Sequence, residues 1–359
     1  MLSYLIVGSG YRALFYGRIA RTYPDRFACL FLCRNREKVE KLQSLGMQAT
    51  QDMEDVRAFS PDLAVIAVSK ADIAHEARIW AEHYPVLTET PAGNTLEKLM
   101  DLWALHESGA RILTCEQYFR YPVLMAGLEA VQSGRIGTPQ SAYVSLMHEY
   151  HAASILRRML LTRGEAFKLR GVQVPEVLVE TDSREGPVLD GHMGRRTREL
   201  LFIRYASGKQ AVYDFSGVQY HSFIRTRHLT VRGTHGEWND RMLYRVDENH
   251  HIEEQRLLLQ VPERYRCLWT PALQALQDRD SLRLGMENAQ DEFAMASMLL
   301  DMEAYLQGGP EPYPLWEALE DAYMALLMHR AWKDPWEMVQ SEQMPWQSAE
   351  ANLQYYANR

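Results

Sequence analysis

The sequence is poor in cysteine and has no excess of positive charge. Its 359 residues include four cysteines, none of them in a C-x-x-C pair, so we expect reduced core thiols and no cysteine-based zinc site. The formal net charge of −8 argues against general nucleic-acid binding, which needs an electropositive face. The twelve histidines lack neighbours that would complete a zinc pattern, and no metal site is predicted.

Long apolar runs are also missing. None approaches the roughly 20 residues that a membrane-spanning helix needs, and residues 1–4 lead directly into a strand-like run without a signal-peptide pattern. We therefore expect a cytoplasmic protein without a membrane partner. The content of 47% hydrophobic and 24% charged residues is that of a globular protein, and the length favours two domains.

A glycine motif stands at the start of the chain. It consists of Gly8, Ser9, Gly10, Tyr11, Arg12 and Ala13, with the G-x-G-x-x-A spacing of a dinucleotide phosphate-binding turn. Gly8 permits the tight turn, Gly10 lets the backbone approach a pyrophosphate, and Ala13 allows close packing of helix against strand. Because tight turns use glycine for other reasons too, an α/β domain without a cofactor is the alternative.

Strand-like and helical segments alternate after this motif. Continuous apolar runs at 27–32, 63–68 and 111–115 are separated by helical patterns at 14–22, 37–45 and 95–108. Buried runs separated by helices are typical of a parallel sheet covered on both faces. Residues 1–120 are therefore predicted to form a doubly wound, Rossmann-type domain.

The remainder, residues 121–359, has a different pattern. We expect helices at 123–133, 152–161, 288–306 and 314–332, a strand at 140–147, and a loop with short strands at 163–191. Further strands at 199–205, 210–215, 226–232 and 237–246 are joined by short glycine turns, which indicates antiparallel pairing. This part is predicted to be an α+β domain.

Five segments, taken in order, resemble the Gfo/Idh/MocA family of glucose-fructose oxidoreductase and inositol dehydrogenase. They are the glycine motif, Glu89-Thr90-Pro91, residues 117–122, residues 136–139 and the helix that begins at His151. The resemblance covers nearly the whole chain and implies a Rossmann domain followed by an open antiparallel sheet that binds substrate. It also implies a homodimer or homotetramer and a sugar, polyol or glycoside as substrate.

The resemblance implies roles for particular residues. His151 is the candidate for taking or returning the hydroxyl proton, because imidazole titrates near neutrality, and Tyr118 could relay or orient that proton. The family lysine is Thr90 here, whose hydroxyl can donate a hydrogen bond but carries no charge, and the family aspartate is Met147. Cofactor contacts outside the glycine motif are expected from Ser69, Glu89, Pro91 and Gln117.

The choice between NAD and NADP depends on the end of the second strand. An acidic residue there would accept hydrogen bonds from the 2′-hydroxyl of NAD. The chain instead has Arg34 followed by Asn35, and a guanidinium can clamp a 2′-phosphate. NADP is therefore slightly favoured, with a solvated basic turn as the alternative.

Substrate contacts are expected from a set of polar and aromatic residues. These are Arg120, His148, Tyr150, His221 and Arg225. His221 and Arg225 would share one face of a strand at 220–225, because alternate residues of a strand point the same way. The adjacent Arg157 and Arg158 could also bind an acidic substrate.

The predicted activity is hydride transfer between NAD(P) and a hydroxyl carbon of the substrate. Two alternatives stay open. One is a redox-neutral, glycoside-processing enzyme that retains NAD. The other is a dinucleotide-binding sensor without turnover, since Thr90 cannot supply the family's titrating amine.

Overall fold

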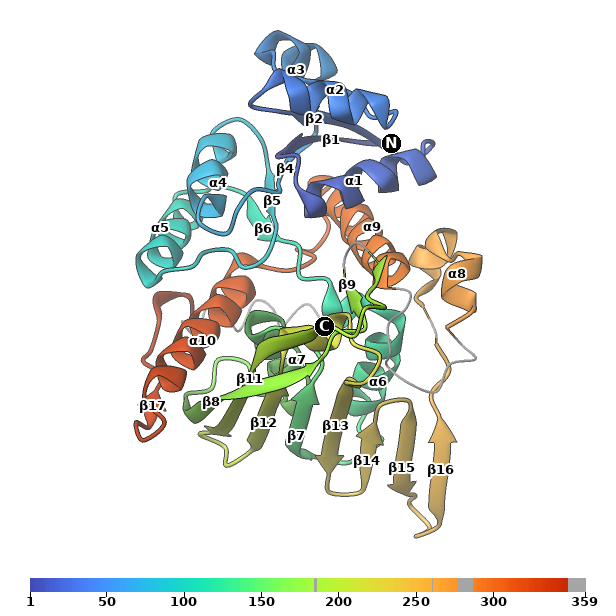
Figure 1. The fold of residues 1–359 in the computed structure, drawn as a ribbon, viewed down its shortest axis with the longest axis vertical. Coiled ribbons are helices and arrows are strands. Elements are labelled where there is room, and N and C mark those ends of the chain that lie inside the picture. The colour runs from blue at the N-terminus through green and yellow to red at the C-terminus, as the bar shows by residue number, and fades with distance from the viewer. Residues whose placement is uncertain (184–185, 260, 277–286, 348–359) are drawn as a thin grey trace.

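The computed structural model describes residues 1–183, 186–259, 261–276 and 287–347. The chain forms a six-stranded sheet, a nine-stranded sheet and a small two-stranded hairpin (Figure 1). The six-stranded sheet comes from the first 114 residues, and the nine-stranded sheet from elements between residues 139 and 340. The predicted combination of a doubly wound parallel sheet with an open, mainly antiparallel sheet is confirmed.

The strands of the first sheet are all parallel and follow the order β3-β2-β1-β4-β5-β6. Their bounds are β1 Leu2–Val7, β2 Phe27–Leu32, β3 Ala49–Thr50, β4 Leu63–Ile66, β5 Val86–Thr88 and β6 Ile112–Thr114. Because the order reverses between β1 and β4, the connections after these strands run in opposite directions and leave a crevice at the carboxyl edge.

Helices connect these parallel strands. Their bounds are α1 Tyr11–Thr22, α2 Arg36–Ser44, α3 Met53–Phe59, α4 Ile73–Ala81 and α5 Leu96–Glu107. Asn35, Asp52 and Thr95 each accept a hydrogen bond from a backbone N–H of the following helix, which satisfies a donor that the first turn leaves unpaired. The strands expected from the apolar runs and the helices expected between them are confirmed.

The second sheet has the order β16-β15-β14-β13-β7-β12-β11-β8-β17. Its bounds are β7 Pro139–Ser145, β8 Phe167–Val179, β11 Met193–Tyr205, β12 Gln210–Phe215, β13 His228–Gly233, β14 Gly236–Asn239, β15 Met242–Val246, β16 Ile252–Arg256 and β17 Val339–Gln340. All neighbours are antiparallel except β7 and β12, which are parallel. The small hairpin pairs β9 Asp182–Ser183 with β10 Gly186–Pro187.

The expectation of loop with short strands at 163–191 is wrong for residues 167–179 and is met after them by the short strands β9 and β10. Strand β8 runs for thirteen residues and pairs with β11 along its full length. Gly171 and Pro175 lie inside β8, and both residue types are depleted in strands and obscure the alternating pattern. The hydrogen-bonded pairing with β11 therefore determines that residues 167–179 form a strand, and the low strand propensity of glycine and proline does not prevent it.

Two further expectations about strands are wrong. Residues 220–225 are not a strand, because a short 3-10 helix at Gly217–Tyr220 ends there and an irregular segment follows. The strand expected at 237–246 is two strands, β14 and β15, separated by Asp240 with a φ of 50°. A residue in this left-handed region turns the chain back on itself.

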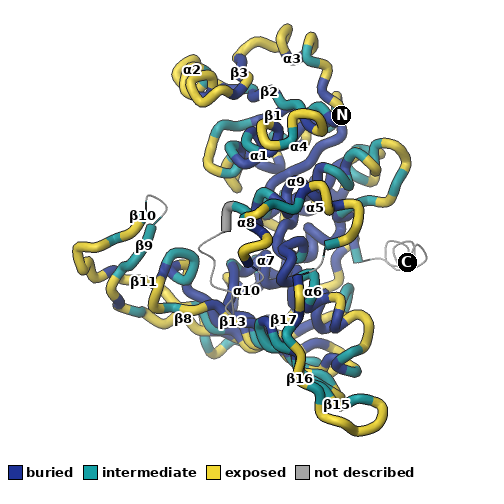
Figure 2. Tube along the Cα trace, turned by 90° about the vertical axis from the view of Figure 1, so that its right-hand side faces the viewer, coloured by how far each residue is buried: buried dark blue, intermediate teal, exposed yellow. Residues whose placement is uncertain are grey.

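The described part of the second half contains the helices α6 Pro122–Gln132, α7 Glu149–Leu160, α8 Pro271–Gln274, α9 Glu287–Leu306 and α10 Leu315–Lys333. Two of them, α9 and α10, return to the first sheet. Helix α9 packs against α1 and β1, while α10 packs against α5 and β6 as well as α7 and β8. Figure 2 shows buried residues concentrated around α7 and α9 and exposed residues along α2 and α3. None of the described helices is both long and apolar enough to cross a membrane.

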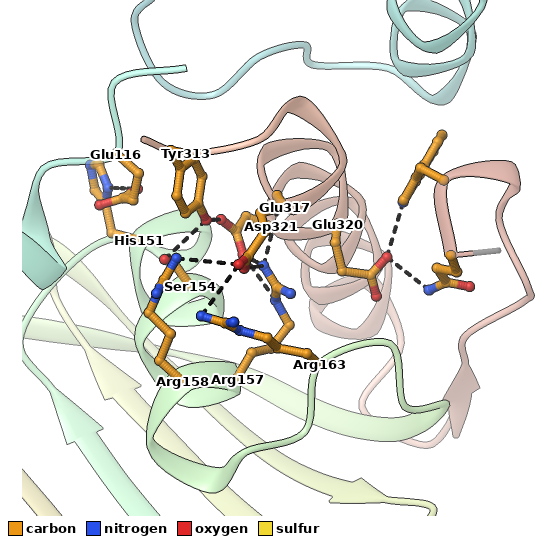
Figure 3. Close-up of polar contacts among 12 residues, drawn as sticks. Glu116, His151, Ser154, Arg157, Arg158, Arg163, Tyr313, Glu317, Glu320 and Asp321 are labelled. Carbon is orange, nitrogen blue, oxygen red and sulfur yellow. Dashed lines mark hydrogen bonds and ion pairs between the residues drawn. The ribbon is translucent and has the colours of Figure 1, made fainter. Parts of the chain in front are cut away.

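A buried ionic cluster joins α7 to α10 (Figure 3). The Nε of Arg157 donates to Oδ1 of Asp321 at 3.0 Å, and its NH2 group donates to the carbonyl oxygen of Glu317 at 3.0 Å. Arg158 and Arg163 also form ion pairs with Glu317, whose side chain is fully buried. Arg157 and Arg158 are themselves buried, so the expectation that they meet an acidic substrate is corrected.

The contact between α6 and β14 provides a test of the packing. A Cβ added at Gly127 would lie 1.8 Å from Cζ2 of the fully buried Trp238. We expect Gly127→Ala to lower the free energy of unfolding by ~1–3 kcal/mol, because overpacking a core costs that amount. Chemical denaturation measures it. Gly217→Ala is the matched control, since its added Cβ would have its nearest contact at 3.7 Å; equal losses in both variants would contradict the packing described here.

Candidate active site

A cleft of about 670 Å³ lies along the carboxyl edge of the first sheet. Loops that follow β1, β2, β4, β5 and β6 supply one side, and α7, α9 and residues 220–221 supply the other. The predicted site residues that line it are Gly8, Ser9, Gly10, Tyr11, Arg12, Arg34, Ser69, Glu89, Thr90, Gln117, Tyr118, His148, Tyr150, His151 and His221. The structure thus brings the glycine motif and His151 to one cavity.

The glycine turn leaves the start of α1 open. Gly8 has a φ of 126°, and a Cβ there would lie 2.3 Å from the carbonyl oxygen of Ala67, so only glycine fits. A Cβ added at Gly10 would meet nothing within 4 Å, and no described side chain caps the N-terminus of α1. The positive end of this helix and this open space fit a pyrophosphate.

Arg12 is held by carboxylates of the cleft wall. Its Nε donates to Oε2 of Glu89 at 3.0 Å, and its NH1 lies 3.4 Å from Oδ1 of Asp291. Although burial opposes the charge, Glu89 and Asp291 raise the pKa of Arg12 well above its usual value. The guanidinium therefore joins the glycine turn, the end of β5 and helix α9 in one charged network.

Positive charge also lies at the end of β2. NH2 of Arg34 donates to Oε1 of Glu76 at 2.6 Å, and the Arg34 side chain is 77% exposed. Asn35 accepts a hydrogen bond from the backbone N–H of Lys38 at 3.0 Å and so caps α2. Arg34 and Lys38 both line the cleft. This end can therefore attract an anionic group.

His151 lies in the first turn of α7 and is 5% exposed. Its Nδ1 is 2.6 Å from Oε2 of Glu116, which follows β6, and Oε1 of Glu116 accepts from the backbone N–H of Tyr118 at 2.9 Å. The rings of Tyr118 and Tyr150 flank the imidazole, with centroids 4.4 and 4.3 Å from its own. The imidazole is thus held by one carboxylate and two aromatic rings.

Neutral polar groups surround this imidazole. Burial raises the pKa of Tyr118 and of Tyr150 well above the usual value, so both are un-ionised phenols. Burial also lowers the pKa of His148 to about 4, with Glu149 opposing the shift, so His148 is uncharged at neutral pH. The Tyr118 hydroxyl donates to that of Tyr220 at 3.3 Å. This end of the cleft therefore offers several neutral hydrogen-bonding groups.

Five predicted site residues do not line the cleft: Ala13, Asn35, Pro91, Arg120 and Arg225. Arg120 is 4% exposed, and its NH1 donates to Asp301 at 2.9 Å. Arg225 donates to Glu176 of β8 at 2.7 Å. Because residues 220–225 are irregular, His221 lines the cleft without Arg225 beside it.

The sequence analysis missed several residues of the cleft and its wall. They are Glu116, Lys38, Ala67, Val68, Lys70, Asp72, Tyr121, Tyr220 and Asp291. Glu116 and Lys70 follow the carboxyl ends of predicted strands, a position that could have indicated them. The Nζ of Lys70 lies 4.7 Å from the ring centroid of Tyr150. Asp291 reaches the cleft from α9, and no local pattern indicates that return of the chain.

Comparison with known proteins identifies the fold. No family model and no curated protein matches the sequence. Three solved structures illustrate the likeness. An oxidoreductase from Agrobacterium radiobacter, in complex with NAD+, L-tartaric acid and magnesium, has a TM-score of 0.69 at 14% identity, over 94% of this chain and 98% of that chain.

A levoglucosan dehydrogenase in complex with NADH and levoglucosan has a TM-score of 0.67 at 14% identity, over 95% of this chain and 100% of that chain. A myo-inositol dehydrogenase from Corynebacterium glutamicum ATCC 13032 has a TM-score of 0.64 at 11% identity, over 96% and 100%. At such identities the likeness establishes architecture and carries no residue roles. The chain has the fold of the Gfo/Idh/MocA-type dehydrogenases.

Proposed function

We propose that the protein is an NAD(P)-dependent oxidoreductase that transfers a hydride to or from a hydroxyl carbon of a sugar or polyol. The proposal rests on one observation: the open glycine turn and His151 line the same cleft. Similar folds whose structures hold NAD+ or NADH, one of them with levoglucosan, support the same class of reaction.

The residues of the turn fit a dinucleotide. Gly10 leaves open space at the start of α1, where the helix N-terminus can meet the pyrophosphate, and Arg34 and Lys38 provide positive charge at the end of β2. When bound, a nicotinamide supplies the hydride acceptor or donor. The charge of Arg34 and Lys38 favours a 2′-phosphate, and hence NADP, over an unphosphorylated ribose.

His151 is the proposed acid and base. A neutral imidazole can take the hydroxyl proton during oxidation, and an imidazolium can return it during reduction. Its low exposure keeps bulk water away from the proton. Thr90 adds no charge here, whereas the ammonium of Lys70 lies over the ring of Tyr150, which in turn contacts His151. Lys70 thus provides positive charge near the reacting oxygen.

The neutral part of the cleft suits a polyhydroxylated substrate. Tyr150 and Tyr220 offer aromatic surface for the C–H faces of a sugar ring, and their hydroxyls can exchange hydrogen bonds with its hydroxyl groups. His148 and His221 also line this part. We therefore propose a sugar or polyol as the substrate class.

Nucleotide binding can be tested at Gly10. Gly10→Val should keep the fold, because a Cβ there meets no other atom within 4 Å, but it fills the open space at the start of α1. We expect Kd for NADPH and NADH to rise by ~10-fold or more, a loss of about 1.4 kcal/mol, with Tm nearly unchanged. Calorimetric titration and thermal unfolding measure both quantities. Unaltered affinity would place the dinucleotide elsewhere.

Cofactor preference can be tested at Arg34. Arg34→Gln should weaken binding of NADPH by ~10-fold and leave that of NADH nearly unchanged, because one charge-assisted contact contributes ~1.5–3 kcal/mol. Arg36→Gln is the matched control, since Arg36 is also an exposed arginine, 86% against 77% for Arg34, and forms an ion pair with Glu40 of its own helix. An Arg34 variant that loses both nucleotides equally would remove the argument for NADP.

The proton-transfer role can be tested at His151. His151→Asn should lower kcat by ~10²- to 10⁴-fold, the usual contribution of a general acid or base, without changing Kd for the nucleotide. Reduced-nicotinamide absorbance is followed with levoglucosan, myo-inositol and L-tartrate as probes. Turnover that survives the substitution would exclude His151. A signal that rises and then decays to its starting value would indicate the redox-neutral glycoside reaction in place of net oxidation.

A further inference from the structure

We propose that Glu116 is the positioning residue of His151: it holds the imidazole with its proton on Nδ1, so that Nε2 is the atom that exchanges a proton with the substrate. The proposal rests on the proposed function of His151 as acid and base. Glu116 itself touches neither cofactor nor substrate in this role and acts through the imidazole.

The hydrogen bonds determine the direction of donation. Oε2 of Glu116 lies 2.6 Å from Nδ1 of His151, and Oε1 accepts from the backbone N–H of Tyr118 at 2.9 Å. An ionised carboxylate only accepts hydrogen bonds, so Nδ1 must be the donor. In the neutral imidazole the lone pair then resides on Nε2. The tautomer that serves as a base at Nε2 is therefore selected by Glu116.

Packing prevents the imidazole from leaving this arrangement. Glu116 is 1% exposed and His151 is 5% exposed, and the rings of Tyr118 and Tyr150 contact the imidazole. Glu116 follows β6 of the first sheet, whereas His151 belongs to α7 beside the second sheet. The acid–base group is thus completed only where the two halves of the chain meet.

Other titratable groups surround the Glu116–His151 pair. They are Lys70 after β4, Tyr118 in a 3-10 helix at Tyr118–Arg120, His148 just before α7, Glu149 and Tyr150 on α7, Tyr220 in the 3-10 helix at Gly217–Tyr220, Asp321 on α10, and Tyr313 just before α10. Burial raises the pKa of Asp321 to about 7, and Arg157 opposes that shift. Asp321 lines a small cavity behind Glu116 and is bonded to Tyr313 and Arg157 (Figure 3). Glu116 is therefore the carboxylate in direct contact with His151.

The charge of Glu116 has a second consequence. A carboxylate beside an imidazole stabilises the imidazolium that forms when His151 accepts a proton.

Glu116→Gln keeps an acceptor of the same size but removes the charge. We expect kcat to fall by ~100-fold and the acidic limb of the kcat/KM profile to move to lower pH, because the imidazolium is then less stable. Glu116→Asp, which retains the charge, should restore part of kcat.

A readout that does not depend on turnover tests the tautomer. The full chain is labelled with ¹⁵N-histidine and studied by NMR without nucleotide, and the His151 resonances are assigned by their loss in His151→Asn. We expect a protonated Nδ1 in the natural protein and a shift toward the Nε2-protonated form in Glu116→Ala, which leaves Nδ1 without its acceptor.

Glu320→Gln is the matched control. Glu320 is also 1% exposed, and its Oε2 accepts from Trp346 and Gln347. Its side chain lies on the side of α10 that faces away from His151 (Figure 3). It should change neither the tautomer nor the pH profile. Thermal unfolding confirms that each variant is folded. If Glu116→Ala does not fold, kcat and the pH profile of Glu116→Gln carry the test.

The outcomes separate the two proposals. A protonated Nε2 in the natural protein, or a pH profile and kcat in Glu116→Gln equal to those of Glu320→Gln, would overturn the role of Glu116. The proposed function is instead contradicted by full turnover in His151→Asn. Loss of the Nδ1-protonated form in Glu116→Ala, together with the shifted pH profile in Glu116→Gln, would support the positioning role.

Discussion

The site depends on how α7 is locked into the interior. Arg157 binds Asp321 and the backbone of Glu317, both on α10, with almost no exposure to solvent. Removing one partner would leave a charge buried and unpaired, which costs ~3–5 kcal/mol. Because α10 also packs against α5 and β6, this cluster connects α7 to the first sheet through α10. His151, less than two turns earlier on α7, is thereby placed beside the carboxyl end of β6.

Charge in the cleft is arranged in two regions. At the glycine turn, Arg12 is balanced by Glu89 and Asp291, so the positive end of the α1 helix dipole is left as the main attraction for a phosphate. Around His151 the tyrosines and His148 are neutral, and Glu116 supplies the negative charge that contacts the imidazole. A nucleotide and an uncharged, hydroxylated substrate can therefore occupy neighbouring parts of one cavity.

The sequence predicted the parallel sheet because buried strands such as β2 and β4 carry continuous apolar runs. It also predicted the glycine turn, whose need for Gly8 follows from a positive φ and from the approach of Ala67. Strand β8 could not be predicted, since pairing with β11 overrides the local effect of Gly171 and Pro175. Gln117 was predicted as a site residue, but the adjacent Glu116 was not. Asp291 is brought to the cleft only by the return of α9 to the first sheet.

We infer that a dinucleotide in this cleft places its nicotinamide next to His151. A crystal structure of the natural protein with NADPH is the decisive measurement. We expect density for the pyrophosphate at the backbone of Gly10 and for the nicotinamide ring in contact with the imidazole edge that carries Nε2. A nicotinamide turned away from His151, or a dinucleotide bound outside the cleft, would rule out hydride transfer beside this histidine.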